Sequence, residues 1–460
     1  MEETTVGVDV GGTFTDVVLL RESDLVTAKV PSTADQSVGV MDGIRKACEK
    51  ADVAPDAVDD FAHAMTVSVN ALLEEDGAKT ALVTTDGFRD VLEVGRQNRP
   101  SLYDFDAEKP DPLVPRRRRF TVGERATPDG VVESVDTDAL GDVAASIRES
   151  GAEAVAVCLL HAYAHPENES IVADVLDDEL DVPVSVSHEV LAEFREYERT
   201  STTVADAYVT PAIDAYIGRL VDRAADAGVP EPSVMQANGG ITDAATVRKH
   251  AVRTCMSGPA AGVVGARASV GDVADDRDLA GLVTFDMGGT SSDVSLVRDG
   301  EVEQTTDAEI NGRPIKTPMV DVTTVGAGGG SKGWVDPGGA LRIGPESAGA
   351  EPGPVCYGRG GTVPTVTDAN VVLGYIGEST TLGGELSIDV DAARDALSEL
   401  ADEAGLDGPL EAARGMYRVA NATMTRAIRA VTLERGYDPR NFGLVAFGGA
   451  GPMHAAALAD

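Results

Sequence analysis

The chain has few lysines, only four cysteines and no long apolar run. Lys and Arg together number 38 against 77 Asp and Glu, giving a formal charge of −39 over 460 residues. Nucleic acid and anionic membranes need a basic face, so we expect neither as a partner. No stretch of 18 apolar residues occurs, and the N-terminus has no basic segment followed by an apolar one. We therefore predict a cytoplasmic protein without export signal or membrane span.

The scarce cysteines and histidines form no metal-like pattern. The four cysteines are widely scattered and fit neither a CxxC metal site nor a disulfide framework, so we expect reduced, mostly buried thiols. Only Cys356, inside a Gly/Pro-rich segment, is considered as a site residue, and a structural role is favoured for it. The six histidines also lack the spacing of metal ligands.

The acidic composition indicates a folded protein from a salt-rich, halophilic cytoplasm, where dissolved ions screen the repulsion between like charges. One basic run, Arg116–Arg119, follows two prolines. We expect it on a loop or strand edge, paired with nearby carboxylates, rather than in an anion site.

Apolar runs such as 81–83 and 154–157 alternate with amphipathic stretches, which is α/β patterning. Long helices are predicted over 197–224, interrupted by Pro211 and crossing between lobes, and over 410–435. The Gly/Pro-dense segment 314–361 has little periodicity, so we predict functional or poorly ordered loops there. Its Gly328–Lys332 run lacks the P-loop order and is not interpreted as one.

Two near-copies of one motif, Asp9–Asp16 (DVGGTFTD) and Asp286–Asp293 (DMGGTSSD), lie between short apolar runs. Each predicts a strand, a Gly-Gly turn and a second strand. Glycines expose backbone N–H groups to a ligand, and the hydroxyls add donors. An aspartate that ends the incoming strand can hold a divalent ion through water. Each hairpin is therefore a candidate phosphate site, and two indicate related lobes closing on one polyphosphate.

A third motif, Leu444–His454 (LVAFGGAGPMH), predicts a strand, a glycine turn and a helix start. Gly448, Gly449 and Gly451 would leave a flat surface for a purine and its ribose. Two phosphate hairpins followed by this turn resemble the actin, sugar-kinase and Hsp70 ATPase superfamily. The resemblance implies Mg-ATP bound between two ribonuclease-H-like lobes with mixed sheets and flanking helices.

Further segments resemble the A subunit of the hydantoinase/oxoprolinase family (the N-methylhydantoinase A and ATP-dependent 5-oxoprolinase type) and span nearly the whole chain. They are 70–74, 80–90, 195–203, 236–240, 257–266, 325–331, 344–358, 365–370 and 434–440. Two sites depart from the family pattern. Residues 63–67 read HAMTV where HGTTV is usual, which removes a hydroxyl and a glycine from a predicted site loop. Lys332-Gly333 stands where Ile-Ala is common.

The resemblance implies three domains: an N-terminal hydantoinase/oxoprolinase domain over 1–190, a linking helix and return segment over 191–280, and a hydantoinase A domain over 281–460. Members resembling this chain continue beyond Asp460, so we expect a fragment with an incomplete second lobe. A B-type subunit is expected as partner in a hetero-oligomer.

The residue roles follow from the motif match. Asp9 and Asp286 are predicted to anchor hydrated Mg²⁺, and Asp16 and Asp293 to orient hydroxyls or water; these four are the catalytic candidates. Phosphate contacts are predicted for Gly11, Gly12, Thr13, Thr15, Gly288, Gly289, Thr290 and Ser291, and adenosine contacts for Gly448, Gly449 and Gly451. Asp321, Glu346 and Asp368 are weaker candidates for substrate contact.

Three functions fit this pattern. The first is an ATP-dependent hydrolase subunit that phosphorylates a cyclic amide such as hydantoin, 5-oxoproline or another lactam, because an amide carbonyl is a poor electrophile until its oxygen is activated. The second is the ATP-using subunit of a ketone carboxylase. The third is an actin/Hsp70/reactivase-like ATPase that acts on a protein. Family-like segments between the hairpins favour the first two.

Overall fold

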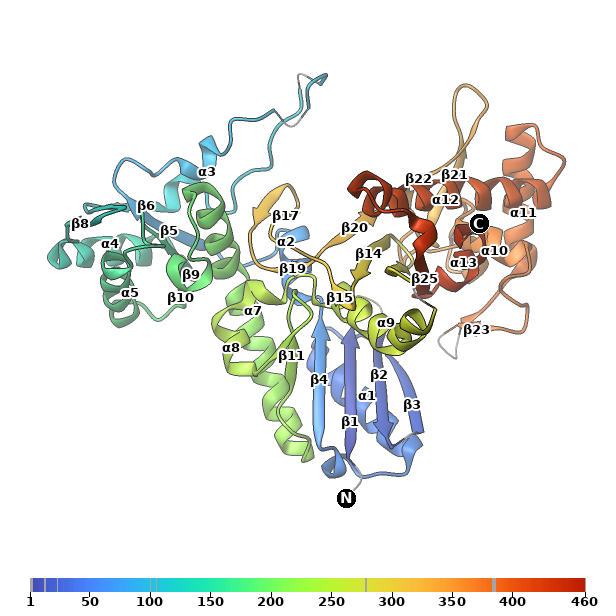
Figure 1. Ribbon diagram of the computed structural model, residues 1–460, viewed down its shortest axis with the longest axis horizontal. Helices are drawn as coiled ribbons and strands as arrows, with labels where there is room; N and C mark the ends of the chain where they lie inside the picture. Colours follow the sequence, from blue (N-terminus) through green and yellow to red (C-terminus); the bar gives the residue numbers. More distant parts are fainter. Residues whose placement is uncertain are drawn as a thin grey trace. The chain divides into compact units, whose positions relative to one another are not determined.

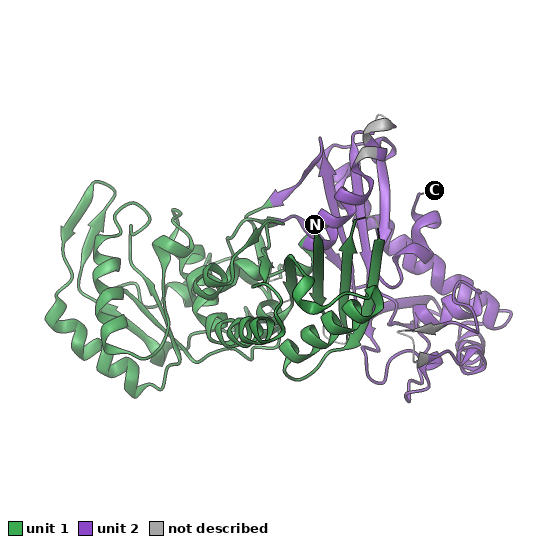
Figure 2. Ribbon diagram, turned by 90° about the horizontal axis from the view of Figure 1, so that it is seen from below, with its two compact units in different colours: residues 1–260, 305–319 green, residues 261–304, 320–460 purple. Residues whose placement is uncertain are grey.

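The computed structural model describes residues 3–11, 14–22, 24–99, 101–104, 106–277, 279–382 and 386–459. The chain divides into two compact units, which Figure 2 colours separately. Unit 1 comprises residues 1–260 and 305–319, and unit 2 comprises residues 261–304 and 320–460.

Unit 1 contains a six-stranded mixed sheet with the order β12-β11-β4-β1-β2-β3 (Figure 1). β1, β2 and β3 are antiparallel neighbours, whereas β4 runs parallel to β1 and β11 parallel to β4. Val6, Val8 and Val10 of β1 are buried and alternate with more exposed residues, as a two-residue repeat requires. The strands are β1 Thr4–Val10, β2 Phe14–Arg21, β3 Asp24–Pro31, β4 Asp60–Met65, β11 Ser233–Met235 and β12 Ile241–Thr242.

Unit 1 also contains a parallel sheet with the order β10-β9-β5-β6. Every residue of β5 and β9 is buried, which explains the uninterrupted apolar runs of these strands. The strands are β5 Thr80–Thr85, β6 Arg119–Val122, β9 Ala154–Cys158 and β10 Val184–Val186; the associated helices are α3 Val91–Val94, α4 Thr137–Glu149, α5 Glu167–Glu179 and α6 Ser187–Val190.

The 32-residue helix α7 (Glu196–Ala227) joins the cores of these two sheets. Val209 and Ile213 pack in the core of the six-stranded sheet, whereas Val204 and Ala207 pack in a core of the parallel sheet. Pro211 lies inside the helix and does not end it, so the predicted interruption was wrong. Other elements of unit 1 are β7 Arg125–Thr127, β8 Gly130–Glu133, β17 Ala308–Ile310, β18 Arg313–Ile315, α1 Gln36–Ala51, α2 Val67–Leu73 and α8 Ala244–Lys249.

Unit 2 repeats the arrangement seen around β1. Its central sheet has the order β15-β14-β13-β25, and β20 pairs with β14 as well. β13 and β14 form an antiparallel hairpin, and β25 runs parallel to β13, as β4 does to β1. The strands are β13 Gly281–Met287, β14 Ser292–Arg298, β15 Glu301–Val302, β20 Val322–Val325 and β25 Phe442–Phe447.

Helices cover this sheet, and α12 supplies Met424, Ala427 and Ile428 to the core against β13 and β14. The helices of the second half are α9 Ser257–Asp276, α10 Val366–Val372, α11 Val390–Ala404, α12 Pro409–Val431 and α13 Gly451–Ala459. The remaining short strands are β16 Gln304–Thr305, β19 Met319–Val320, β21 Ser331–Val335, β22 Leu341–Ser347, β23 Thr381–Leu382 and β24 Leu386–Ser387.

The α/β class, both hairpins and the strand–turn–helix after residue 442 are confirmed. The expectation of loops over 314–361 was wrong in part: β19, β20, β21 and β22 lie in this range, whereas residues 326–330 and 348–354 form neither helix nor strand. α7 belongs wholly to unit 1, so it does not cross between lobes; the chain passes into unit 2 within α9. The predicted linking segment 191–280 is therefore divided between the units at residue 260.

Candidate functional site

The first hairpin places two aspartates opposite each other. Asp9 of β1 is the register partner of Asp16 of β2, so their side chains leave the same face of the sheet with Cβ atoms about 5 Å apart. The Gly11 N–H donates to the Phe14 carbonyl at 3.0 Å and closes the turn. Like charges in opposed positions destabilise a strand pair, and a divalent cation would remove that repulsion.

The two carboxylates have different surroundings. Asp16 forms a 2.6 Å ion pair with Lys29 on β3. Asp9 is solvent-accessible at the strand end but is crowded by protein atoms, and this partial burial raises its pKa; the Asp16 charge raises it further, while Lys29 lowers it. A carboxyl whose pKa is raised by burial and a like charge is stabilised in its charged form when a cation binds.

The hydroxyl at the base of this turn faces inward. Thr15 pairs with Val10 in the register and is fully buried, 3.5 Å from the Ser32 hydroxyl, which itself donates to the Gly11 carbonyl at 2.7 Å. Thr15 therefore supports the turn from below. Gly12 and Thr13 lie outside the described residues.

The segment read as HAMTV borders Asp9. Residues 63–65 belong to β4, where Ala64 is the parallel partner of Asp9. The Thr66 hydroxyl donates to the Val10 carbonyl at 3.1 Å. His63 is buried against the Tyr216 hydroxyl at 2.8 Å, and burial lowers its pKa to about 4. The departure from the family pattern thus lies directly beside a predicted metal ligand.

The second hairpin reproduces this geometry. Asp286 of β13 is the register partner of Asp293 of β14, and the Gly288 N–H donates to the Ser291 carbonyl at 3.0 Å. Gly288, Gly289 and Thr290 are exposed at the tip and Ser291 is half-buried, while Ser292, which corresponds to Thr15, is fully buried. Asp293 accepts a 2.6 Å hydrogen bond from Thr324; burial raises the pKa of Asp293, and this bond lowers it.

The third motif is attached to the second hairpin. Phe447 of β25 lies beside Asp286 of β13, and the Ala450 N–H donates to the Met287 carbonyl at 2.9 Å. Gly448 has φ +79°, and a Cβ there would lie 2.1 Å from Asp286 Oδ1 and 2.7 Å from Met287 O. Only glycine fits this position. Gly448 and Gly449 are exposed, whereas Gly451 is buried at the start of α13.

A glycine segment to which sequence reasoning gave no role lies against the tip of the second hairpin. The N–H groups of Gly329 and Gly330 donate to the carbonyls of Gly288 and Gly289 at 3.0 and 2.6 Å. In a trans peptide the C=O and the following N–H point in opposite directions. The next two hairpin N–H groups therefore point away from this segment, as donors to an anion would.

Helix α10 braces this glycine segment. The Thr367 N–H and hydroxyl both donate to the Gly329 carbonyl, at 2.7 and 2.9 Å. One turn further, the Asn370 side-chain nitrogen lies 3.2 Å from His454 Nε2 on α13. The Asn421 side-chain oxygen lies 3.0 Å from His454 Nδ1. Because Asn421 offers an oxygen, His454 carries its proton on Nδ1; burial lowers the pKa of His454 to about 4.

The weaker candidates all have structural partners. Asp321 pairs with Arg435, and Glu346 lies 3.2 Å from Lys332. Asp368 is fully buried and accepts from four donors, the Thr365 N–H and hydroxyl and the N–H groups of Val355 and Cys356.

The cysteine and arginine expectations are largely confirmed. Cys48, Cys158, Cys255 and Cys356 are free thiols and buried, and burial is the largest cause of the raised pKa of Cys356. In the basic run Arg116 pairs with Asp90 at 2.9 Å, as predicted. Arg119 is instead fully buried, where it bonds to Glu93 and the Val114 carbonyl.

Among the described residues, no group of three or more His, Cys, Asp or Glu side chains is arranged to hold a metal ion. Mg²⁺ is commonly bound by one or two carboxylates, water and substrate phosphates rather than by a cage of protein ligands. The aspartate pairs are compatible with this mode of binding. No helix in the described part of the chain is both long and apolar enough to cross a membrane.

Family comparisons agree with the duplicated hairpin geometry. A model described as Hydantoinase/oxoprolinase N-terminal region matches residues 5–180, and one described as Hydantoinase/oxoprolinase matches residues 199–460. The chain belongs to the hydantoinase/oxoprolinase family. 5-oxoprolinase 1 of Arabidopsis thaliana is 35% identical to the chain over 98% of the chain's length. The chain spans 39% of that protein.

Two solved structures resemble this family member throughout. ATP-dependent caprolactamase from Pseudomonas jessenii has a TM-score of 0.87 over 99% of the chain; its subunit alpha is 37% identical, and the chain spans 67% of it. The nucleotide-free structure of acetone carboxylase has a TM-score of 0.82 and 27% sequence identity. The match covers 100% of this chain and 68% of the acetone carboxylase chain. Both have the actin-like ATPase fold, which confirms the predicted fold class.

Proposed function

We propose that the chain is an ATP-using subunit that activates the carbonyl group of a cyclic amide for ring opening. The observation that carries this proposal is the pair of matching hairpins, in which Asp9 faces Asp16 and Asp286 faces Asp293. ATP bound with Mg²⁺ would supply a phosphoryl group that makes the amide carbonyl electrophilic. The relatives named caprolactamase subunit alpha and 5-oxoprolinase 1 support this substrate class.

The residues present fit a magnesium nucleotide. Asp9 and Asp286 would each contact hydrated Mg²⁺ through water, because each is the second-last residue of an incoming strand that leads into a Gly-Gly turn. Phosphate contacts are proposed for Gly11, Gly12, Thr13, Gly288, Gly289, Thr290 and Ser291, and Thr15 is left out because it is buried. Gly448 and Gly449 would carry adenosine; Gly451 is buried and would act only by starting α13.

The chain's own contribution is positioning and charge neutralisation. Phosphoryl transfer needs little covalent help from a protein, so fixed N–H donors and anchored carboxylates are sufficient. The contacts of Gly329 and Gly330 hold the hairpin peptides in one orientation. Such preorganised donors cost no rearrangement when charge develops.

A ketone-carboxylase subunit is the second candidate, and the similarity to acetone carboxylase favours it. The two functions share ATP use and differ in the acceptor. The decisive assay measures steady-state ATP hydrolysis with hydantoin, 5-oxoproline, caprolactam and acetone, in the presence of the B-type partner and with bicarbonate varied. Stimulation by a cyclic amide supports the first proposal. Stimulation by acetone only, and only with bicarbonate, refutes it in favour of the second.

We further propose that the chain needs a B-type subunit to complete the reaction. Caprolactamase subunit alpha is by its name one subunit of a larger enzyme. No described residues form a metal-ligand cluster that could finish a ring opening here. The purified chain alone should hydrolyse ATP weakly and release no ring-opened product. Stoichiometric ring opening by the monomeric chain would contradict this proposal.

A further inference from the structure

Unit 1 contains a pocket of about 440 Å³ that includes no residue of the first hairpin. Its walls come from the residues after α3, from residues 109–113, from the first turns of α7 and from the β17–β18 hairpin. A pocket of this volume suits a small-molecule ligand. It is lined by part of the family-like segment 195–203, to which nucleotide binding gives no role.

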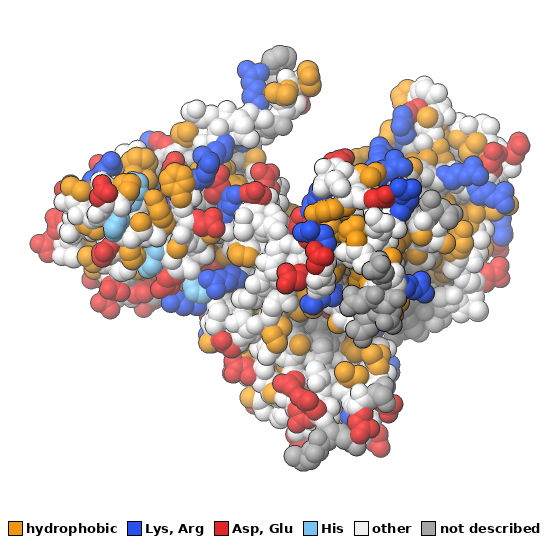
Figure 3. Space-filling model, viewed as in Figure 1, with side chains coloured by type: hydrophobic (Ala, Val, Ile, Leu, Met, Phe, Trp, Pro, Cys, Tyr) orange, Lys and Arg blue, Asp and Glu red, His pale blue; other side chains and the backbone are white. Residues whose placement is uncertain are grey.

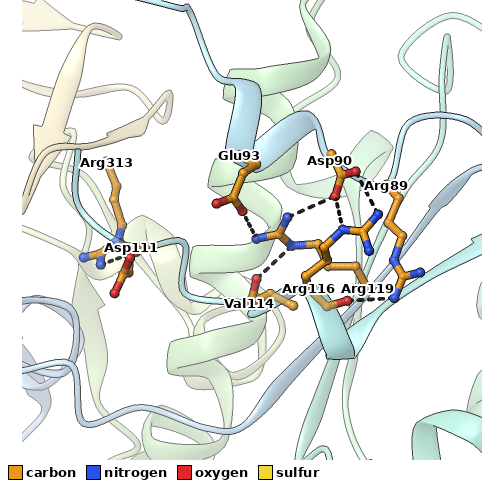
Figure 4. Close-up of polar contacts among 8 residues, drawn as sticks. All are labelled: Arg89, Asp90, Glu93, Asp111, Val114, Arg116, Arg119 and Arg313. Atoms are coloured by element: carbon orange, nitrogen blue, oxygen red, sulfur yellow. Dashed lines mark hydrogen bonds and ion pairs between the residues drawn. The ribbon is translucent and has the colours of Figure 1, made fainter. Parts of the chain in front are cut away.

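Part of the wall is fixed by paired charges. Arg96 binds Glu198 with both its Nε, at 2.6 Å, and a terminal nitrogen. Arg313 is nearly buried and donates to the Asp111 carbonyl at 3.1 and 2.6 Å and to Glu75 at 2.7 Å. Figure 4 shows Arg313 turned toward Asp111. These contacts hold the wall and leave Arg96 and Glu198 largely neutralised.

Four other charged groups in the pocket have no such partner. Within the described ranges, the cations of Arg99 and Lys109 form no ion pair or hydrogen bond, and neither do the carboxylates of Asp111 and Glu309; all four lie at exposed residues. Exposed cations elsewhere in the described ranges, such as Arg117 and Arg125, also lack an ion pair, so what distinguishes this pocket is that unpaired charges of both signs line it together. Two free cations and two free carboxylates in one pocket are the charge pattern of a site for a ligand that carries both signs.

A tyrosine hydroxyl that has no partner among the described residues adds a neutral polar contact. Tyr197 on α7 is half-buried in the pocket wall, and its hydroxyl forms no hydrogen bond with the described residues. Its phenol lies within the fields of Glu198, Glu309, Arg96 and Arg313. A tyrosine hydroxyl can both donate and accept, so it can serve either end of a zwitterion.

We propose that this pocket binds a small amino acid as a zwitterion. Arg99 and Lys109 hold the carboxylate, Asp111 and Glu309 hold the ammonium group, and Tyr197 donates or accepts one hydrogen bond. Charge-assisted hydrogen bonds at both ends of the ligand give selectivity over singly charged compounds. The proposal does not rest on the proposed function, because neither ATP nor the hairpin aspartates take part.

The test is a calorimetric titration of the full chain with 6-aminohexanoate, at the lowest KCl concentration that keeps the chain folded. Arg99→Gln and Glu309→Gln should each weaken binding about two- to fivefold, as expected for exposed charge contacts. Arg125→Gln is the matched control, since Arg125 is exposed on β7 and outside the pocket. It should leave the affinity unchanged.

Singly charged probes separate this proposal from its alternatives. Hexanoate should bind more weakly than 6-aminohexanoate and be insensitive to Glu309→Gln, and hexylamine should be insensitive to Arg99→Gln. Absence of any binding of 6-aminohexanoate at millimolar concentration would overturn the proposal. Equal affinity for hexanoate and 6-aminohexanoate, or binding unchanged in both pocket variants, would overturn it as well. None of these readouts depends on ATP hydrolysis, so failure here leaves the proposed function standing.

Discussion

A methyl group at Gly328 should push the second hairpin out of position. A Cβ built there would lie 2.6 Å from Thr290 C and 2.7 Å from both Gly289 O and Ser291 N. An ordinary contact is about 3.5 Å, so the hairpin or the glycine segment must move by nearly 1 Å. The obstructing atoms are backbone atoms and cannot rotate aside. Gly328→Ala therefore tests whether the glycine segment fixes the phosphate-binding tip.

Overpacking of this kind costs about 1–3 kcal/mol. For a unit of this size, each kcal/mol lowers the melting temperature by about 2–4 °C, so we expect a decrease of roughly 2–12 °C. A displacement near 1 Å at a reacting group can cost about 100-fold in rate. ATP turnover in the presence of the B-type partner should therefore decrease ten- to a hundredfold.

Gly326→Ala is the matched control. No atom lies within 4 Å of a Cβ at Gly326, its φ is outside the left-handed region, and the residue is exposed. Both substitutions restrict the unfolded chain to a similar extent, so the difference between them isolates the clash. Differential scanning calorimetry and a coupled ATPase assay give the two readouts. A Gly328→Ala protein with the melting temperature and turnover of Gly326→Ala would refute the reasoning.

Three further predictions follow from the sites and charges. Asp9→Asn or Asp286→Asn should abolish ATP turnover while changing the melting temperature little, because the metal neutralises charge in the transition state; wild-type turnover in either variant would remove that residue from the metal role. Buried His454 has a pKa of about 4 in the folded protein against 6.5 unfolded. Its contribution to the free energy of unfolding is therefore present above pH 6.5 and declines as the pH falls toward 4, by about 2 kcal/mol at pH 5. The His454→Gln protein should lack this part of the decline, so wild-type and variant stability curves that run parallel from pH 7 to 5 would contradict the assignment. With a charge of −39, and with acidic side chains gathered over α4 and α5 in Figure 3, melting temperature should rise steeply with KCl as repulsion is screened; a flat dependence up to molar salt would refute the halophilic hypothesis.

The local sequence pattern was sufficient to predict the two hairpins, because the residues that form each hairpin follow one another directly in the chain. In each motif an apolar strand, a glycine turn and a second strand follow one another, and the antiparallel register then places Asp9 opposite Asp16 automatically. The same two-residue repeat could have excluded Thr15 as a phosphate ligand, since it falls on the face of buried Val10. The motif was interpreted by residue type and not by strand face, which is why Thr15 was included, and its burial argues against a phosphate contact.

The sequence by itself therefore determined the α/β class, the two aspartate hairpins and the strand–turn–helix that carries Gly448, because each is encoded within about 20 neighbouring residues. Only the tertiary structure decided which distant segments support them. It set Gly328–Gly330 against Gly288 and Gly289, and it linked α10 to His454, through contacts between residues that lie far apart in the chain. It also decided where strands form within 314–361: β19 and β20 pair with the earlier strands β16 and β14, whereas β21 and β22 pair with each other as a local hairpin. Hydrogen bonds and packing between such distant groups leave no periodic signal in the sequence, so no local pattern could have predicted them.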